Sequence, residues 1–390
     1  MLRFVTAGES HGETLVATLS GMPAGVRVDL GRVNRDLWRR QQGFGRGGRM
    51  KIETDKAHIV SGVRHGHTIG SPIAILLRNR DWKNWTETLP VEDYEGSSEH
   101  ARPVSRPRPG HADLAGAIKY NYPEARYILE RASARETAAR VAAGAFAKLL
   151  LSEFGIEVLS HVVAVGDVKL GRRATWAELQ ALAAKDEVLL NCVDPEVEQR
   201  MKAVVDEAIR TKDTCGGIFE IVVRGAPIGL GSHVSWDAKL DGRLAQAIVS
   251  MQAVKGVEIG SAAVAAASPG SKVQDTIHYD RDAREFTRGS NTAGGLEGGI
   301  TNGQDVVVRG YLKPISTLRR PLESVDLSTR EPASAAYERS DVAVIPAAGV
   351  IGEAMVALTV AAAFLEKFGG DSLGEVRRNY DGYLQQVRSY

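Results

Sequence analysis

The chain has 390 residues, of which 43% are hydrophobic and 25% are charged, the ordinary composition of a globular protein with a large core. Its 49 lysines and arginines are nearly balanced by 48 aspartates and glutamates, which gives a net charge of +1. This balance argues against a dedicated nucleic-acid-binding protein, whose affinity would come from a surplus of cations.

The chain shows no sign of export or of membrane insertion. Acidic Glu9 lies in the opening segment, which has no apolar signal core. The most apolar stretch, Ala354–Leu365, is expected to be too short to span a bilayer. Cys192 and Cys215 fit neither a disulfide framework nor a metal site, so we expect them to be small buried hydrophobic residues. The sequence therefore predicts a cytoplasmic protein.

Hydrophobic periodicity predicts strands and helices in mixed order. Strands are expected at Leu2–Val5, Val26–Leu30, His58–Val63, Pro72–Arg78, Ile156–Val168, Gly217–Arg224 and Gln304–Leu312. Helices are expected at Arg32–Gln42, Ser133–Phe154, Pro195–Thr211, Asp237–Val254 and Glu353–Phe368. A doubly wound parallel sheet needs regular strand–helix alternation, which is missing, so we predict an α+β architecture. No linker or repeat divides the chain, and we expect one domain over residues 1–390.

The Ala-rich helix in the middle of the chain has a distinctive start. Ser133 and Glu136 fit a capping box, and Gly155 fits the C-terminal stop. Arg131 and Arg135 flank the cap, beside a helix N-terminus that already attracts anions. A helix start does not need these arginines, so they predict an anion-binding site.

Two glycine motifs near the N-terminus match known sequence patterns but lack the flanking strands and helices that those patterns require. Gly8–Gly12 fits the G-x-S-x-G elbow of serine hydrolases, but no clear helix follows it, so a hydrolase is the weaker alternative. Gly43, Gly45 and Gly48 fit the G-x-G-x-x-G of dinucleotide sites. In a dinucleotide site a strand precedes the glycines and a helix follows them, whereas this sequence predicts a helix before the glycines and an extended segment after them.

The second glycine motif is rich in cations. No acidic residue lies between Asp36 and Glu53, a stretch that contains Arg39, Arg40, Arg46, Arg49 and Lys51. Guanidinium groups on a loop that can wrap a ligand predict capture of phosphate or carboxylate. A solvated basic face, a subunit contact and an RNA-binding surface are the alternatives.

Two histidines are candidate proton carriers. His111 lies in the segment RPRPGHAD, where prolines stiffen the backbone on both sides of Arg108. The reference pKa of histidine, about 6.5, suits proton transfer near neutral pH. Glycine-flanked His11 is a second candidate of the same kind. His65 and His67 have no third ligand nearby in sequence, so we predict no metal site.

Three later segments complete the candidate site. The glycine-rich run from Asn291 to Gly303 implies close approach of the backbone to a ligand or another strand. The segment Lys313–Thr317 supplies a cation and two hydroxyls, which suits a phosphate, and Arg339 lies two residues from Asp341. Together these residues predict an enzyme for a small, multiply anionic substrate, with histidines as proton carriers.

Eight motifs occur in one order between residues 8 and 349, and together they resemble those of the chorismate synthase family: GESHG, RRQQGFGRGGRMKIETD, RPGHAD, ERASARETAARVAAGA, KGVEIG, NTAGGLEGGITNG, KPIST and RSDVAVIPAAG. That family binds reduced FMN and converts 5-enolpyruvylshikimate 3-phosphate to chorismate and phosphate, the last step of the shikimate pathway. The resemblance implies this lyase activity, a β-α-β sandwich with helices between antiparallel sheets, and a homotetramer.

The resemblance also assigns roles for a 1,4-anti-elimination, in which phosphate leaves C3 and a hydrogen leaves C6. His11 would protonate the departing phosphate, His111 would help maintain the reduced flavin near its N1, and Asp341 would work with flavin N5. The arginines expected to clamp the substrate are Arg40, Arg46, Arg49, Arg108, Arg135 and Arg339.

The FMN positions of the family carry over to Arg131, Ala132, Ser133, Gln252, Ala253, Gly298, Lys313, Pro314, Ile315, Ser316, Thr317 and Arg339. Arg40 and Arg46 also match family positions for NADPH. The sequence leaves open whether the flavin is reduced by NADPH on this chain or by an external flavin reductase.

Overall fold

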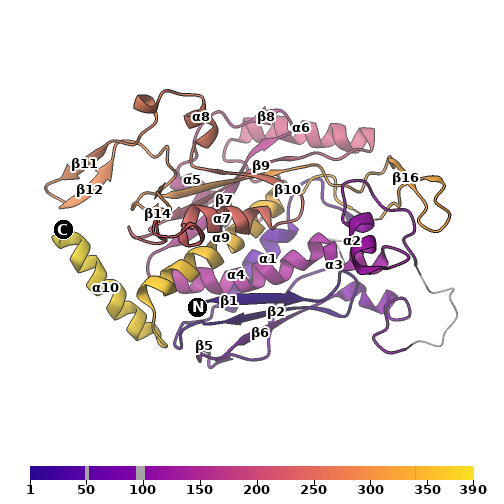
Figure 1. Ribbon diagram of the computed structural model, residues 1–390, viewed down its shortest axis with the longest axis horizontal. Helices are drawn as coiled ribbons and strands as arrows, with labels where there is room; N and C mark the ends of the chain where they lie inside the picture. Colours follow the sequence, from indigo (N-terminus) through magenta and orange to yellow (C-terminus); the bar gives the residue numbers. More distant parts are fainter. Residues whose placement is uncertain (49–51, 94–101, 339) are drawn as a thin grey trace.

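The computed structural model describes residues 1–48, 52–93, 102–338 and 340–390, and it places a layer of helices between two antiparallel sheets (Figure 1). The four-stranded sheet has the order β1 (Arg3–Ala7), β2 (Thr14–Ser20), β6 (Ile73–Arg78), β3 (His58–Ile59). The five-stranded sheet has the order β10 (Val254–Ile259), β15 (Val306–Leu312), β9 (Gly217–Arg224), β7 (Glu157–Val165), β8 (Val168–Lys169). Neighbouring strands are antiparallel, so the predicted α+β sandwich is confirmed.

The helix layer contains α1 (Leu30–Gln41), α4 (Thr137–Ser152), α7 (Leu240–Val249) and α9 (Ile345–Phe368). The other helices are α2 (Asp113–Tyr120), α3 (Arg126–Ala132), α5 (Trp176–Ala184), α6 (Pro195–Thr211), α8 (Ala262–Ala266) and α10 (Leu373–Ser389). Short strands form the hairpins β4 (Val63–Arg64)–β5 (His67–Thr68), β11 (Ile277–Asp280)–β12 (Glu285–Arg288), β13 (Leu296–Glu297)–β14 (Ile300–Thr301) and β16 (Glu323–Val325)–β17 (Pro332–Ser334).

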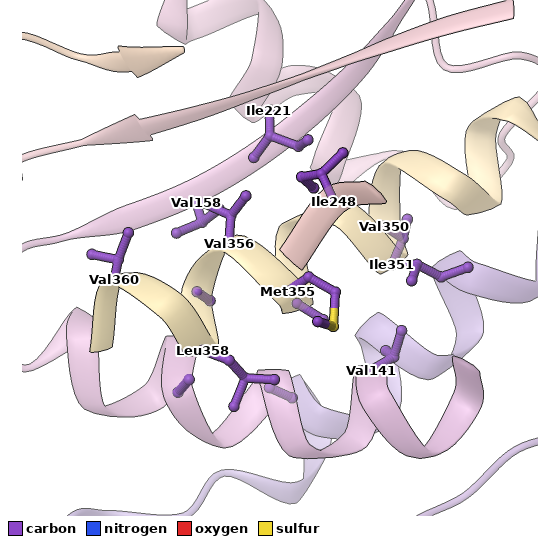
Figure 2. Close-up of a cluster of buried hydrophobic side chains, with 14 of the residues drawn as sticks. Val141, Val158, Ile221, Ile248, Val350, Ile351, Met355, Val356, Leu358 and Val360 are labelled. Carbon is purple, nitrogen blue, oxygen red and sulfur yellow. The ribbon is translucent and has the colours of Figure 1, made fainter. Parts of the chain in front are cut away.

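One hydrophobic core joins the two sheets through the helices. Figure 2 shows part of it, with Val158 and Ile221 from the five-stranded sheet, Val141 from α4 and Val356 from α9. The same cluster of buried side chains extends to Leu15 in the four-stranded sheet. The sheets therefore bury their inner faces against a shared layer, which contributes most of the hydrophobic stabilisation.

The helix α9 lies at the centre of this core. Its 24 residues make it long and apolar enough to cross a membrane by length and composition, so the expectation of a stretch too short to span was wrong. However, 89% of its most apolar window is buried inside the fold, against α4 and the five-stranded sheet. A helix that is apolar all round is expected in such a position.

Gly144 of α4 sets the close approach of α4 to α9. A Cβ atom at this position would lie 2.3 Å from the Cβ of Ala354. We therefore expect Gly144→Ala to lower the free energy of unfolding by about 1–3 kcal/mol, because overpacking forces the two backbones apart. Denaturant unfolding measures this change.

The matched control is Gly382→Ala in α10, where an added Cβ meets nothing within 4 Å. This variant should be up to about 1 kcal/mol more stable than the wild type, because alanine has the higher helix propensity. A Gly144→Ala protein as stable as the control would contradict the steric argument.

The predicted strand Ile156–Val168 is divided into β7 and β8 at Gly166, which has a φ of +57°, and two further predicted strands differ from the structure. Val26–Leu30 is not a strand, because the Asp29 side chain accepts hydrogen bonds from two N–H groups of the following turn and α1 begins at Leu30. The predicted strand His58–Val63 is divided between β3 and β4, since Gly62 has a φ of +81° and turns the chain. In both places a local turn overrides the alternating pattern.

The predicted capping box of α4 is also wrong. The Ser133 hydroxyl accepts from the Arg135 N–H, within a short 3-10 turn that precedes α4, and not from the N–H of Glu136. The Glu136 carboxylate instead accepts hydrogen bonds from the Arg140 guanidinium and the Thr6 hydroxyl. The predicted stop is confirmed, because α4 ends at Ser152 and Gly155 adopts a φ of +71°.

Candidate active site

Loops and helix ends enclose a cavity of about 550 Å³. Its walls come from segments that are far apart in the chain, and Ser10, Trp85, Glu338 and Val344 all contribute to them. Most of the predicted site residues line this cavity: His11, Arg40, Arg46, Arg108, His111, Ala132, Ser133, Arg135, Gln252, Ala253, Lys313, Ile315, Ser316, Thr317 and Asp341.

His11 lies in the loop between β1 and β2, where it contacts the buried carboxylate of Glu130 in α3. Its Nδ1 lies 2.9 Å from Glu130 Oε1, and its backbone N–H donates to Glu130 Oε2 at 2.8 Å. The imidazole stacks on the Trp85 ring with a centroid distance of 4.0 Å and an interplanar angle of 23°. The loop is tight because Gly8 has a φ of +98°, where a Cβ would lie 2.3 Å from a backbone oxygen.

The serine-hydrolase alternative fails on this same loop. A nucleophile elbow needs a helix directly after the serine, whereas the chain here enters strand β2. The Ser10 hydroxyl donates to the Ser133 hydroxyl at 3.0 Å. His11, the nearest histidine in sequence, turns its Nδ1 to Glu130.

His111 forms the second histidine–carboxylate pair of the cavity. Its Nδ1 lies 2.5 Å from Asp113 Oδ1, and the same carboxylate accepts Arg108 Nε at 2.8 Å and Nη2 at 3.0 Å. Burial raises the pKa of Asp113, but the hydrogen bonds from His111 and Arg108 outweigh it and leave this pKa well below its usual range. Arg108 Nη1 donates to Thr317 Oγ1 at 2.7 Å, so the guanidinium is held firmly.

The arginine cluster contains Arg40 at the end of α1, Arg46 in the next loop and Arg135 before α4. Arg135 Nη1 lies 2.7 Å from the Asp55 carboxylate, and Arg46 Nε lies 3.4 Å from Asp341 Oδ2. Although the cation-rich stretch contains no acid of its own, carboxylates from other parts of the chain supply counter-charges to this cluster.

Two guanidinium nitrogens of the cluster have unused hydrogen-bonding capacity. Arg40 Nη1 and Arg135 Nη2 are buried and have no hydrogen-bond partner within the described part of the chain. Their closest carboxylates are 3.6 Å away at Asp55 and 3.8 Å away at Glu53. Burial, together with the positive charges of Arg135 and Arg46, lowers the pKa of Arg40 to about 9. Such buried donors favour binding of an anion.

A second set of residues in the cavity suits a phosphate-bearing cofactor. Lys313 Nζ donates to Gly110 O at 2.9 Å and to Ser316 Oγ at 3.0 Å, and burial lowers the pKa of Lys313. Gln252 Oε1 is buried without a hydrogen-bond partner among the described residues. Ala253 follows with a φ of +65°, and its carbonyl accepts from the Lys313 N–H.

A family model described as chorismate synthase matches residues 2–365. The chain belongs to the chorismate synthase family. The chorismate synthase of Solibacter usitatus is 75% identical over 390 residues, and that of Koribacter versatilis is 66% identical over 395 residues, each with 100% of both chains covered. A crystal structure of a chorismate synthase has a TM-score of 0.79 and 40% identity, with 100% of this chain and 99% of that chain covered.

Some positions carried over from the chorismate synthase family lie outside the cavity. Arg131 donates to the carbonyls of Thr6 and Gly8, and neither Gly298, in the turn between β13 and β14, nor Pro314 lines the cavity. Arg49 and Arg339 lie outside the described residues. Five residues therefore keep roles that are predictions from the resemblance alone: Arg49, Arg131, Gly298, Pro314 and Arg339.

The structure adds residues that the sequence did not single out in this member of the chorismate synthase family. Glu130 and Asp113 orient the two histidines, and Asp55 and Asn79 orient Arg135. Asp113 had a visible signal, since it lies two residues after a candidate histidine. Glu130 begins and Asp55 ends a quoted motif, but neither was given a role, and Asn79 lies in none of the motifs. Ordinary acidic and amide residues become informative only beside their partners.

Metal binding has no support in the described ranges. They contain no group of three or more His, Cys, Asp or Glu side chains that could hold an ion. His65 and His67 belong to the β4–β5 hairpin, where His67 Nδ1 contacts the carbonyl of His65 at 3.0 Å.

Proposed function

We propose that this chain is a chorismate synthase that eliminates phosphate from 5-enolpyruvylshikimate 3-phosphate to give chorismate, with reduced FMN as cofactor. Family membership supports the activity, and chorismate synthases use a reduced flavin. The observation that carries the proposal is one cavity lined by the histidines of two histidine–carboxylate pairs and by buried arginine nitrogens that have no hydrogen-bond partner among the described residues. A substrate with two carboxylates and a phosphate matches these charges.

The arginine cluster is the proposed substrate clamp. Arg40 and Arg135 offer buried donors, and Arg108 presents its guanidinium from a fixed position. Fixed cations hold a multiply charged substrate in one orientation and stabilise the negative charge that develops on the departing phosphate.

The residues around Lys313 fit the proposed FMN site. Lys313, Ser316 and Thr317 supply donors for a phosphate, while Gln252 and Ser133 supply polar groups from other segments of the wall. When bound, FMN supplies transient electron donation to the substrate without net redox change.

Three side chains are the proposed proton carriers. His11 would donate a proton to the departing phosphate, and His111 would stabilise the charge of the reduced cofactor. Asp341, which accepts a hydrogen bond from the Gly47 N–H at 2.5 Å, would assist removal of the substrate proton. General acids and bases of this kind contribute about 10²–10⁴-fold to a rate.

The remaining assignments rest on the resemblance. We propose one domain over residues 1–390, a homotetramer, a cytoplasmic location, and NADPH or an external flavin reductase as the source of electrons, with Arg40 and Arg46 as the NADPH positions. The shared core of the two sheets supports the single domain.

The decisive experiment is an anaerobic assay with chemically reduced FMN and 5-enolpyruvylshikimate 3-phosphate. Chorismate absorbance and released phosphate are followed together, with oxidised FMN as the control. Equal amounts of both products with reduced FMN alone support the proposal. A folded protein that binds FMN but forms neither product would overturn it.

Replacing Arg40 tests the substrate clamp separately from the cofactor site. Arg40→Met keeps an unbranched side chain out to the position of Nε but removes the charge and the buried donor that faces the cavity. We expect the KM for substrate to rise by about tenfold or more, because one charge-assisted hydrogen bond is lost, while the Kd for FMN changes by less than about threefold.

Arg243→Met is the control for this variant, since Arg243 pairs with Glu366 outside the cavity. It should leave both constants unchanged. An FMN-binding defect without a change in substrate KM would show that Arg40 belongs to the cofactor site instead.

A further inference from the structure

One carboxylate holds His11 at two points. Glu130 accepts the His11 backbone N–H at 2.8 Å and lies within 2.9–3.0 Å of Nδ1 through both of its oxygens. A carboxylate can only accept hydrogen bonds, so Nδ1 must carry a proton. The other ring nitrogen, Nε2, is then the atom that exchanges a proton with a ligand in the cavity.

The plane of the imidazole is fixed as well. Trp85 is 4% exposed and stacks on His11, and its indole lies 4.4 Å from the Arg102 guanidinium. Trp85 Nε1 donates to Asp81 Oδ2 at 3.3 Å, which holds the indole in its own plane. His11 therefore has one orientation, set by Glu130 at its edge and Trp85 at its face.

The two histidine–carboxylate pairs differ in charge. Arg108 contacts Asp113 at 2.8 and 3.0 Å and so compensates the carboxylate next to His111. Among the described arginines and lysines, the contact of Glu130 is with Arg126 Nη1 at the longer distance of 3.3 Å, and Arg126 also bonds to Glu338 at 3.0 Å. More of the negative charge of Glu130 therefore acts on its histidine.

Glu130 keeps this charge at neutral pH. It is 1% exposed, and burial raises its pKa, but the hydrogen bonds and the charge of His11 together with Arg126 outweigh burial and lower that pKa. The charged groups near His11 are Glu130 and Arg126 on α3 and Arg102 behind Trp85. The cavity wall adds Arg40, Arg46, Arg108, His111, Arg135, Lys313, Glu338 and Asp341.

We propose that Glu130 is the positioning residue that holds His11 as an imidazolium with Nδ1–H on the carboxylate, so that Nε2–H is the proton given to the departing phosphate. In this elimination the C3–O bond breaks and its electron pair leaves with the phosphate, while the C6–H bond breaks, its electron pair forms the new ring double bond, and its proton is removed with the help of Asp341. The Nε2 proton passes to a phosphate oxygen, and His11 remains neutral with its Nδ1–H still on Glu130. Solvent returns the proton to Nε2 after the product leaves. This inference rests on the proposed function.

The test is Glu130→Gln, which keeps the shape and one acceptor oxygen, replaces the other oxygen with an NH2 donor, and removes the charge. We expect kcat to fall by about 10- to 100-fold, with a substrate KM within about threefold of wild type. The alkaline limb of the kcat profile should move about one pH unit lower, because the imidazolium loses its counter-charge. Glu130→Asp keeps the charge and should retain more activity than Glu130→Gln.

A double-mutant cycle separates positioning from a merely structural role. In a His11→Ala background, Glu130→Gln should change kcat by less than about twofold, because the group that it acts through is gone. A full loss in that background would overturn the proposal. Glu366→Gln, at an arginine-paired carboxylate outside the cavity, is the matched control and should leave kcat unchanged.

A readout without substrate keeps this inference distinct from the proposed function. Imidazole ¹⁵N NMR of the free protein, with the His11→Ala spectrum for assignment, should show His11 protonated at Nδ1 and losing its charge at lower pH in Glu130→Gln. An unchanged titration overturns the role of Glu130 even if chorismate forms. A shifted titration in a protein that makes no chorismate would instead reject the proposed function. If Glu130→Gln does not fold, the same titration is carried out on Glu130→Asp. A midpoint close to that of wild type supports the role of the charge. A midpoint that moves by about one pH unit rejects it.

Discussion

His11→Ala is expected to lower kcat by about 100-fold or more, the usual scale for the loss of a general acid. The imidazole lies in the cavity wall with its Nδ1 held at Glu130, so the variant removes the proposed proton donor without removing any arginine of the clamp. The substrate KM should therefore change much less than kcat. Anaerobic single-turnover release of phosphate, with reduced FMN in excess, measures the affected step directly.

His67→Ala is the control for this experiment, because His67 is exposed in the β4–β5 hairpin and lies outside the cavity. It should retain wild-type turnover. His111→Ala should also lose about 100-fold, but through the second histidine–carboxylate pair. Wild-type turnover in both His11→Ala and His111→Ala would contradict the proposed roles and leave the family assignment intact.

Glu353→Ala is expected to lower the free energy of unfolding by about 3–5 kcal/mol, because it leaves buried cations without their partner. Glu353 is completely buried in α9. Its carboxylate accepts two hydrogen bonds from Arg39 at 2.7 Å, one from Lys148 at 2.8 Å and one from Ser160 at 2.7 Å. Urea unfolding at a fixed protein concentration measures the loss.

The same carboxylate predicts a pH dependence of stability. Burial raises the pKa of Glu353, but Arg39 and Lys148 outweigh it and lower the pKa from 4.5 to about 2. A group whose pKa is lower in the folded state stabilises the fold above its unfolded value, and this contribution disappears as pH falls from about 4.5 to about 2. Wild type should therefore lose more stability than Glu353→Gln across this interval. A parallel loss in the two proteins would show that the Glu353 carboxylate does not titrate with unfolding.

Much of the fold was predictable from local patterns. β9 and α6 have the predicted bounds, and α6 carries clear signals, with Asp194 as its cap and Pro195 in its first turn. β10 was missed because its apolar residues continue the spacing of the preceding helix. The boundary between this helix and β10 is a turn at Ala253, which has a φ of +65°. An alanine rarely adopts this conformation, so the sequence gives no sign of the turn.

The candidate site was predictable only in part. Motifs marked His11, His111 and most of the arginines, and the structure brings them to one cavity. Arg39, grouped with those arginines by sequence, instead binds Glu353 in the core. Two neighbouring arginines at the end of a helix point in different directions, so adjacency in sequence could not distinguish the cavity residue from the core residue.

The sequence by itself determined the family, the α+β class and the residue types of the site, because motif order, hydrophobic periodicity and side-chain chemistry are all read along the chain. Only the tertiary structure determined which carboxylate pairs with which histidine or arginine. Glu130 meets His11 from 119 positions away, and Glu353 meets Arg39 from 314 positions away. These pairs form only when α3 packs beside the β1–β2 loop and α9 beside α1, since a charge can be buried only where its partner is already in place.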